Sequence, residues 1–278
     1  MSAGSLISGS PHALTSFSMS TYPTTGDIRV ALDQYVATVE FARPPHNHFN
    51  EALISGLADV LEALDQDDSC RAVVLAAEGK VFCAGADFSA AEHNNGQPVS
   101  AGLLYKKGLR MFRTRKPVVA AVHGAAVGGG LGLALAADFR VTCDEARFSA
   151  NFARLGTHPG FALTATLPRL VGTQQAALLF YTGRRISGTE AVRLGLADML
   201  VPQAEVRSAA WQLAAEIAAS APQSVMSVRA TLRRGLAEAA ETATEREFVE
   251  QHWQFMLEDF SEGKAAMAER RVPLFRGR

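Results

Sequence analysis

The chain has 278 residues, of which 48% are hydrophobic, and its formal net charge is −1. That length suffices for one large domain or two small ones with a sizeable core. The balanced charge excludes a general nucleic-acid binder, which would carry an excess of basic residues. The three cysteines form no CxxC pair, which argues against a disulfide framework or a zinc site, so we expect no metal.

The N-terminal 26 residues differ in composition from the rest of the chain. They contain no charged side chain apart from His12 and are rich in Ser, Thr, Gly and Pro. They have neither the basic start of a secretory signal nor the arginines of a mitochondrial presequence. We therefore expect a disordered tail over residues 1–26, with Met19 as an alternative start. No apolar run reaches the ~18–20 residues of a membrane span, so we expect a cytoplasmic protein without membrane contact.

Alternating strand and helix patterns follow the tail. Strands are predicted at 28–32 and 36–41, and Asn50 is expected to cap a helix with apolar residues at helical spacing. Short apolar runs at 72–77, 117–122 and 139–142 are typical of strands that are buried on both faces, with helices predicted at 103–112 and 131–137. This alternation indicates βαβ units and an α/β fold.

Beyond about residue 160 we predict no further strands. Amphipathic helices are expected around Val206–Ile217, around Val228 and Leu232, and around Phe248–Met256. The predicted organisation is an α/β core over residues 27–205, which holds the ligand site, and a helical C-terminal region over residues 206–278.

Two glycine-rich turns follow buried strands, at Val81–Phe88 and His123–Gly132. Glycine permits close backbone approach, and a helix N-terminus offers unpaired N–H groups. Two such donors from separate turns form an oxyanion hole, worth ~3 kcal/mol per donor. The alternatives are glycines that merely allow tight packing, and a Rossmann nucleotide site. Gly130-x-Gly132 lacks the third glycine and the acidic strand end of the latter.

The residues around these turns resemble the crotonase superfamily, which is the enoyl-CoA hydratase/isomerase family. The resemblance covers residues 28–277 in order. It rests on the following segments: Arg43–Asn47, Phe82–Asp87, Lys116–Val118, Gly128–Gly130, Leu155–Gly156, Leu170–Gly172, Tyr181–Gly183 and Glu269–Phe275.

The resemblance implies a spiral of ββα units with a C-terminal helical trimerisation region, assembled as a homotrimer or a dimer of trimers. It also implies that the backbone N–H groups of Ala86 and Gly129 bind the oxygen of an acyl-CoA thioester. Coenzyme A is part of the substrate, so no separate cofactor is expected. The residues expected to contact the substrate are Arg43, Pro45, His46, Ala84, Phe88, Tyr105, Gly132, Phe152, Phe161 and Arg270.

The chain departs from the family pattern where the chemistry is performed. Hydratases of the family use two glutamates, and their positions correspond here to Gly132 and Phe152. The stretch Phe148–Thr164 contains no acidic residue at all. The chain is similar here to the 4-chlorobenzoyl-CoA dehalogenase branch, but the nucleophilic aspartate of that branch would fall at Gly160. We therefore expect neither standard hydration nor dehalogenation.

The best remaining titratable side chain is His158, which we expect either to handle a proton or to fix its loop by hydrogen bonds. Tyr105 is expected to supply packing area, and the two phenylalanines at 152 and 161 indicate an apolar or aromatic acyl group.

Two classes of function follow from these residues. The first is an acyl-CoA enzyme that passes through an oxyanion-stabilised enolate or tetrahedral intermediate, in hydrolysis, decarboxylation, C–C cleavage or isomerisation. The second is a non-catalytic acyl-CoA-binding protein. Weak hydration by a backbone-held water is a third alternative.

Overall fold

The computed structural model describes Tyr22 and residues 26–87 and 101–278. Phe88 and nearly all of the predicted tail lie outside the described residues. The main sheet has the strand order β1-β2-β3-β4-β6-β9. Its strands are β1 (Ile28–Asp33), β2 (Val36–Phe41), β3 (Ala72–Ala77), β4 (Val118–Val122), β6 (Phe139–Thr142) and β9 (Met199–Leu200). Only β1 is antiparallel to its neighbour, and the other pairings are parallel.

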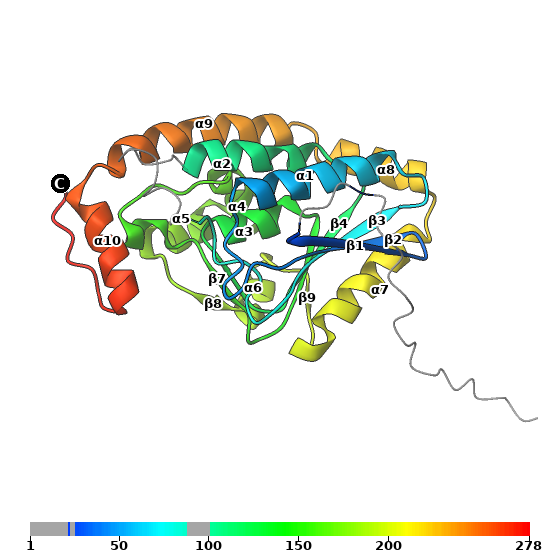
Figure 1. Ribbon diagram of the computed structural model, residues 1–278, viewed down its shortest axis with the longest axis horizontal. Helices are drawn as coiled ribbons and strands as arrows, with labels where there is room; N and C mark the ends of the chain where they lie inside the picture. The colour runs from blue at the N-terminus through cyan, green and yellow to red at the C-terminus, as the bar shows by residue number, and fades with distance from the viewer. Residues whose placement is uncertain (1–21, 23–25, 88–100) are drawn as a thin grey trace, which may run out of the picture.

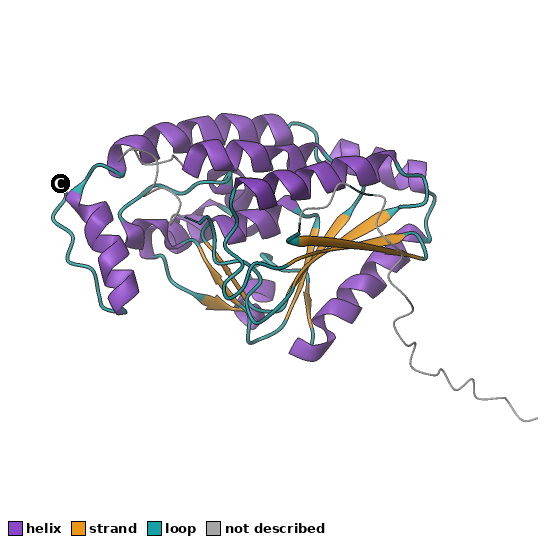
Figure 2. Ribbon diagram, in the orientation of Figure 1, coloured by secondary structure: helices purple, strands orange, loops and turns teal. Residues whose placement is uncertain are grey.

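A second, three-stranded sheet lies beside the main one (Figure 2). It contains β5 (Ala125–Val127), β7 (Arg147–Ser149) and β8 (Ile186–Ser187), with β5 parallel to β7 and β8 antiparallel to β7. The prediction that strands stop near residue 160 is wrong, because β8 and β9 each add an edge strand. Each is two residues long, which is too short for a periodic pattern to reveal.

Helices cover both faces of the main sheet. Helix α1 (Glu51–Gln66) begins at Asn50, whose side chain accepts a hydrogen bond of 2.9 Å from the Leu53 amide, as the sequence predicts. Helix α7 (Val206–Ala218) packs on the opposite face, against β2, β3, β4 and β6. All six residues of β3 are buried between these layers, which explains why the strand is continuously apolar.

The remaining helices lie around the second sheet and along the top of the molecule as drawn in Figure 1. They are α2 (Ala101–Gly108), α3 (Gly129–Ala136), α4 (Leu163–Val171), α5 (Thr173–Thr182), α6 (Gly188–Arg193), α8 (Pro222–Leu232), α9 (Leu236–Gln254) and α10 (Glu258–Glu269). Short 3-10 turns lie at Leu109–Arg113, Asn151–Leu155 and Gln203–Glu205. Helix α9 lies alongside α2 and contacts α4, which brings the C-terminal region onto the core (Figure 1).

Helix α8 does not bury its apolar residues as the sequence pattern suggests. Val228 is 58% exposed and Leu232 is 68% exposed. Further large apolar side chains lie exposed on α9 and beyond it: Val249, Trp253, Met256, Met267, Val272 and Leu274. Packing within this chain therefore buries only part of the apolar residues of these helices.

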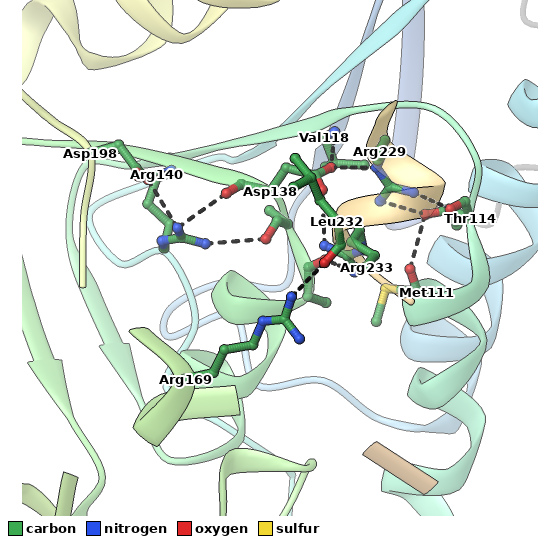
Figure 3. Close-up of polar contacts among 12 residues, drawn as sticks. Met111, Thr114, Val118, Asp138, Arg140, Arg169, Asp198, Arg229, Leu232 and Arg233 are labelled. Carbon is green, nitrogen blue, oxygen red and sulfur yellow. Dashed lines mark hydrogen bonds and ion pairs between the residues drawn. The ribbon is translucent and has the colours of Figure 1, made fainter. Parts of the chain in front are cut away.

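Arg229, the buried residue of α8, makes polar contacts with the core (Figure 3). Asp138, between α3 and β6, accepts hydrogen bonds from Arg229 Nε at 2.8 Å and from Arg233 Nη1 at 2.9 Å. It also accepts from the backbone amide of Val118 at 2.8 Å, at the start of β4. These interactions, the Asp138 network, join α8 to the beginning of a central strand.

Among the residues that the structure describes, no helix combines the length and the hydropathy needed to cross a membrane.

Candidate active site

The two glycine-rich turns lie against each other at the N-terminus of α3. Isolated parallel bridges join Phe49 to Ala86 and Cys83 to Ala126. Gly85 has a φ of +104°, a conformation that side chains with a Cβ rarely adopt, and a Cβ placed there would lie 3.0 Å from the carbonyl oxygen of Val127. The same Cβ would lie 3.4 Å from the amide nitrogen of Gly129, so the turns are in contact.

Two backbone amides at this contact have no hydrogen-bond acceptor within the described part of the chain. Gly129 is the first residue of α3, so its N–H has no partner inside the helix. The bridge between Phe49 and the first turn uses the carbonyl of Gly85 and the amide of Asp87, at 3.0 and 2.9 Å from the Phe49 backbone, and leaves the Ala86 amide out. The helix dipole of α3 adds positive potential at this point. Such a pair of donors suits an oxygen that gains negative charge.

Three aromatic rings cover this N-terminus. Phe49, Tyr105 and Phe161 are fully buried and meet edge to face, with ring centroids 5.5–6.2 Å apart. A Cβ at Gly129 would lie 2.8 Å from Phe49 Cζ, so a larger residue at this position requires the Phe49 ring to shift. We call Phe49, Tyr105 and Phe161 the aromatic cluster. Burial raises the pKa of the Tyr105 phenol well above its ordinary value, which keeps it neutral and in a packing role.

Two further predicted contact residues adjoin the cluster. A Cβ at Gly132 would lie 2.7 Å from Phe161 Cβ, so position 132 has no room for a side chain while Phe161 stays in place. Phe152 is buried, and its Cζ would lie 3.7 Å from a Cβ at Gly128, just before α3. The structure therefore brings together Ala86, Gly129, Gly132, Tyr105, Phe152 and Phe161.

An open cavity of about 390 Å³ lies next to the first glycine-rich turn. Its lining residues are Asp27, Ala42, Arg43, Pro44, Pro45, His46, His48 and Asp87. The amide of Ala84 donates to the carbonyl of His46 at 3.0 Å. This hydrogen bond connects the segment that lines the cavity to the first glycine-rich turn. The predicted contact residues Arg43, Pro45 and His46 thus share one cavity, and Ala84 adjoins them.

The charge of Arg43 is already compensated. Its guanidinium lies 3.3 Å from Asp27 and 3.4 Å from Asp87, and it donates to the backbone carbonyl of His48. This cavity therefore carries two carboxylates and one guanidinium, which favours uncharged ligand groups over phosphates. His48 has a buried Nδ1 without a partner in the described structure, and burial lowers its pKa.

His158 is held by hydrogen bonds of its backbone and by one of its ring. Its amide donates to Gln254 Oε1, and its carbonyl accepts from Gln251 Nε2 at 2.8 Å. The half-buried ring places Nδ1 2.9 Å from the carbonyl oxygen of Pro159. The proton-handling role of His158 stays a prediction, since the fixed backbone is compatible with either role considered above.

One buried carboxylate near the site was missed by sequence reasoning. Glu247 of α9 is 1% exposed and accepts hydrogen bonds from the Ala162 amide at 2.8 Å, the Thr164 amide at 2.9 Å and Thr164 Oγ1 at 2.6 Å. Burial raises its pKa, against the effect of these hydrogen bonds. Leu236, Ala240, Thr244, Glu247 and Gln251 form a buried stripe at helical spacing, which was the available signal.

The remaining predicted residues lie apart from this centre. Arg270 is exposed at the end of α10, where its φ of +57° ends the helix, and it does not line the cavity. Cys83 is fully buried, and burial raises its pKa to about 12, which supports packing rather than nucleophilic chemistry. In the described residues, no group of three or more His, Cys, Asp or Glu side chains is arranged to hold a metal ion.

Comparison with known proteins identifies the family. Residues 32–278 match the model of the enoyl-CoA hydratase/isomerase family. A probable enoyl-CoA hydratase of Bacillus subtilis is 36% identical over 255 residues, covering 90% of this chain and 98% of the relative. A 4-chlorobenzoyl coenzyme A dehalogenase of Arthrobacter is 32% identical over 219 residues, covering 76% of this chain and 79% of the relative. The chain therefore belongs to the enoyl-CoA hydratase/isomerase family, within the crotonase superfamily.

Solved structures agree with this assignment. A carnitinyl-CoA hydratase from Mycobacterium avium superposes with a TM-score of 0.82 at 31% identity, covering 92% of this chain and all of the other. An enoyl-CoA hydratase/isomerase from Pseudoalteromonas atlantica gives 0.81 at 31% identity, covering 90% of this chain and all of the other. The crotonase fold predicted from the sequence is confirmed, and acyl-CoA thioesters are the substrates on which the family acts.

Proposed function

We propose that this protein is an acyl-CoA enzyme that stabilises a thioester oxyanion with the amides of Ala86 and Gly129. The observation that carries the proposal is the pair of unpartnered amides on adjoining turns, one of them at a helix N-terminus. A thioester oxygen bound between them gains negative charge when an enolate or a tetrahedral intermediate forms. The fixed amides lower the barrier because they need no reorganisation at that moment.

The side chains around these amides favour a reaction with little acid–base assistance. Positions 132 and 152 carry glycine and phenylalanine, and Phe161 occupies the space that a side chain at 132 would need. Decarboxylation fits this site best. The bond to the departing carboxylate breaks, CO₂ leaves, and the electron pair forms the enolate that the two amides hold. One proton on the α-carbon then completes the product, and His158 is the proposed donor. Coenzyme A belongs to the substrate, and no further cofactor is needed.

A second candidate is non-catalytic binding of acyl-CoA. It is favoured by the hydrogen bonding of Glu247, the buried carboxylate of this region, whose two oxygens already accept three hydrogen bonds. Hydrolysis, C–C cleavage, isomerisation and weak hydration are the competing reactions within the enzyme class.

We also propose that the protein acts as a trimer or a dimer of trimers in the cytoplasm. The apolar side chains exposed on α8 and α9 and near the C-terminus support this assembly, because monomers rarely expose so much apolar surface. In such an assembly Arg270 meets the coenzyme phosphates of a neighbouring subunit, which accounts for its distance from this chain's own cavity.

Incubation of the purified protein with a panel of acyl-CoA thioesters tests the proposal. The panel contains enoyl, malonyl-type, β-keto and aromatic thioesters, and mass spectrometry reads the products. Gly129→Pro removes one oxyanion donor at a first helical position that tolerates proline. Gly129→Ala is the matched control, because it meets the same Phe49 ring but keeps the N–H.

We expect turnover of one substrate class, with Gly129→Pro about 10²–10³-fold slower than Gly129→Ala. Loss of CO₂ from malonyl-type thioesters would identify decarboxylation, and His158→Ala would then slow proton delivery. Tight binding without turnover of any thioester would favour the binding protein. Equal rates for the two Gly129 variants would contradict the oxyanion role.

A further inference from the structure

Helix α9 presents polar side chains to a loop of the acyl site. Thr244, Glu247 and Gln251 are each at most 2% exposed and share one side of the helix. Buried carboxylates are rare unless they have partners, so the partners of Glu247 indicate what it does. They lie in a single segment, between the 3-10 turn that ends at Leu155 and the first turn of α4.

The backbone of this segment is held in an unfavourable conformation. Phe161 and Ala162 are consecutive non-glycine residues with φ of +60° and +57°. Such residues persist in the left-handed region only where the surrounding structure holds them there. Glu247 accepts from the amide of Ala162, the second residue of this pair, and from the amide and hydroxyl of Thr164.

Glu247 also replaces a missing helix cap. Ala162 is the N-cap residue of α4, and its methyl group cannot accept the hydrogen bonds of the first-turn amides. A carboxylate from α9 accepts them instead. The conformation of the loop therefore depends on the position of α9.

The other end of the loop is held from the same helix. Gln251 and Gln254, four and seven residues beyond Glu247, bind the carbonyl and the amide of His158. The loop from His158 to Thr164 is thus fixed at both ends by α9. Between these ends the loop carries Phe161, whose ring lies in the aromatic cluster and covers Gly132.

We propose that Glu247 is a positioning residue of the acyl site, which acts through Ala162 and Thr164 to hold Phe161 as the wall that limits acyl-group size. The inference rests on the proposed function, because it takes an acyl thioester as the ligand beside this wall. Without Glu247 the loop relaxes and Phe161 moves, so bulkier acyl groups enter and discrimination among acyl groups falls. A cap with a purely structural role would change stability and leave acyl selectivity as it is.

Two variants and one control test this role in the full-length protein. Glu247→Gln keeps the shape of the side chain but replaces one acceptor oxygen with a donor group. Phe161→Ala removes the wall directly and keeps the test decisive if Glu247→Gln fails to fold. Glu245→Gln is the control, because it makes the same change at an exposed position of the same helix.

The first measurement is amide hydrogen exchange of the peptide that covers residues 157–164. We expect exchange at least about tenfold faster in Glu247→Gln than in the wild type or the control. Unchanged exchange in this peptide would overturn the inference, whatever the protein does with acyl-CoA.

The second measurement is the affinity for acetyl-, butyryl-, octanoyl- and benzoyl-CoA by calorimetry, with kcat and KM where turnover occurs. We expect the preference for octanoyl over butyryl to rise about tenfold in both Glu247→Gln and Phe161→Ala, with little further change in the double variant. Unaltered preferences in either single variant, with wild-type binding intact, would overturn the inference and leave the proposed function standing. No binding of any thioester by the wild type would sink the proposed function and this inference with it.

Discussion

Two largely buried carboxylates connect the C-terminal helices to the core, and they are neutralised in different ways. Asp138 is paired with the guanidinium groups of Arg229 in α8 and of Arg233 just after it, whereas Glu247 of α9 accepts hydrogen bonds from neutral amides and a hydroxyl. The first arrangement balances charge with charge at the start of β4. The second leaves a carboxylate that is opposed by dipoles and by the nearby His158 rather than by a guanidinium, directly behind the proposed acyl site.

Because of this difference, the Asp138 contact is fixed by charge pairing, whereas the Glu247 contact can change with the protonation of its carboxyl group. Removing one partner of a buried ion pair leaves an uncompensated charge, so removing a side chain of the Asp138 network should strongly destabilise the protein. Burial raises the pKa of Glu247, so this side chain is more easily protonated than an ordinary glutamate. Helix α9 is therefore attached to the loop of the proposed acyl site through a carboxyl group, Glu247, that gains a proton more readily than an ordinary glutamate.

The largest effect is expected at the Asp138 network. Asp138→Ala leaves the buried Arg229 and the largely buried Arg233 without their carboxylate and should lower the free energy of unfolding by about 3–5 kcal/mol. Urea unfolding followed by circular dichroism measures this loss. Asp68→Ala, at an exposed position, is the matched control and should stay within about 0.5 kcal/mol of the wild type. A small effect at Asp138 would mean that water replaces the lost partner.

A smaller effect is expected where the loop from His158 to Thr164 meets α3. Gly132→Ala places a methyl group against Phe161 and should cost about 1–3 kcal/mol of unfolding free energy through overpacking. Phe161→Ala makes room, so the double variant should lose less than the sum of the two single variants. Gly26→Ala, which meets nothing within 4 Å, is the control. Additive losses would show that residue 161 does not occupy the space beside Gly132.

The regions that could be predicted from the sequence are those with long repeating patterns. Helix α1 and strand β3 follow from apolar spacing, and the family follows from motifs spread along the chain. Strands β8 and β9 could not be predicted, because two residues carry no periodicity. The exposed apolar residues of α8 could not be predicted either, because spacing identifies an apolar face but not what covers it.

The residues of the candidate site likewise divide into those that a local sequence pattern indicates and those that only packing brings together. The glycine-rich turns are local in sequence, so the family resemblance could assign the two amides that we propose for the oxyanion. Glu247 lies 83 residues from Thr164, and only the packing of α9 on α4 brings them together. The absence of acidic residues from Phe148–Thr164 therefore does not mean that this loop lacks a carboxylate partner. The buried carboxylate of this loop comes from a helix that the sequence suggested only as a surface for assembly.

The smallest effect is expected in the pH dependence of stability, and it isolates Glu247. A carboxyl group whose pKa is raised on folding stabilises the protein fully below its unfolded pKa, and this contribution is lost as the pH rises towards the folded value. The groups that face it are Tyr105 of α2 and His158 of the loop. Glu247→Gln does not titrate, so its stability relative to the wild type should improve as the pH rises above the ordinary range of a glutamate. Urea midpoints of both proteins between about pH 4 and 8 measure this trend. A constant difference across that range would mean that neutral dipoles balance the Glu247 charge as fully as two arginines balance that of Asp138.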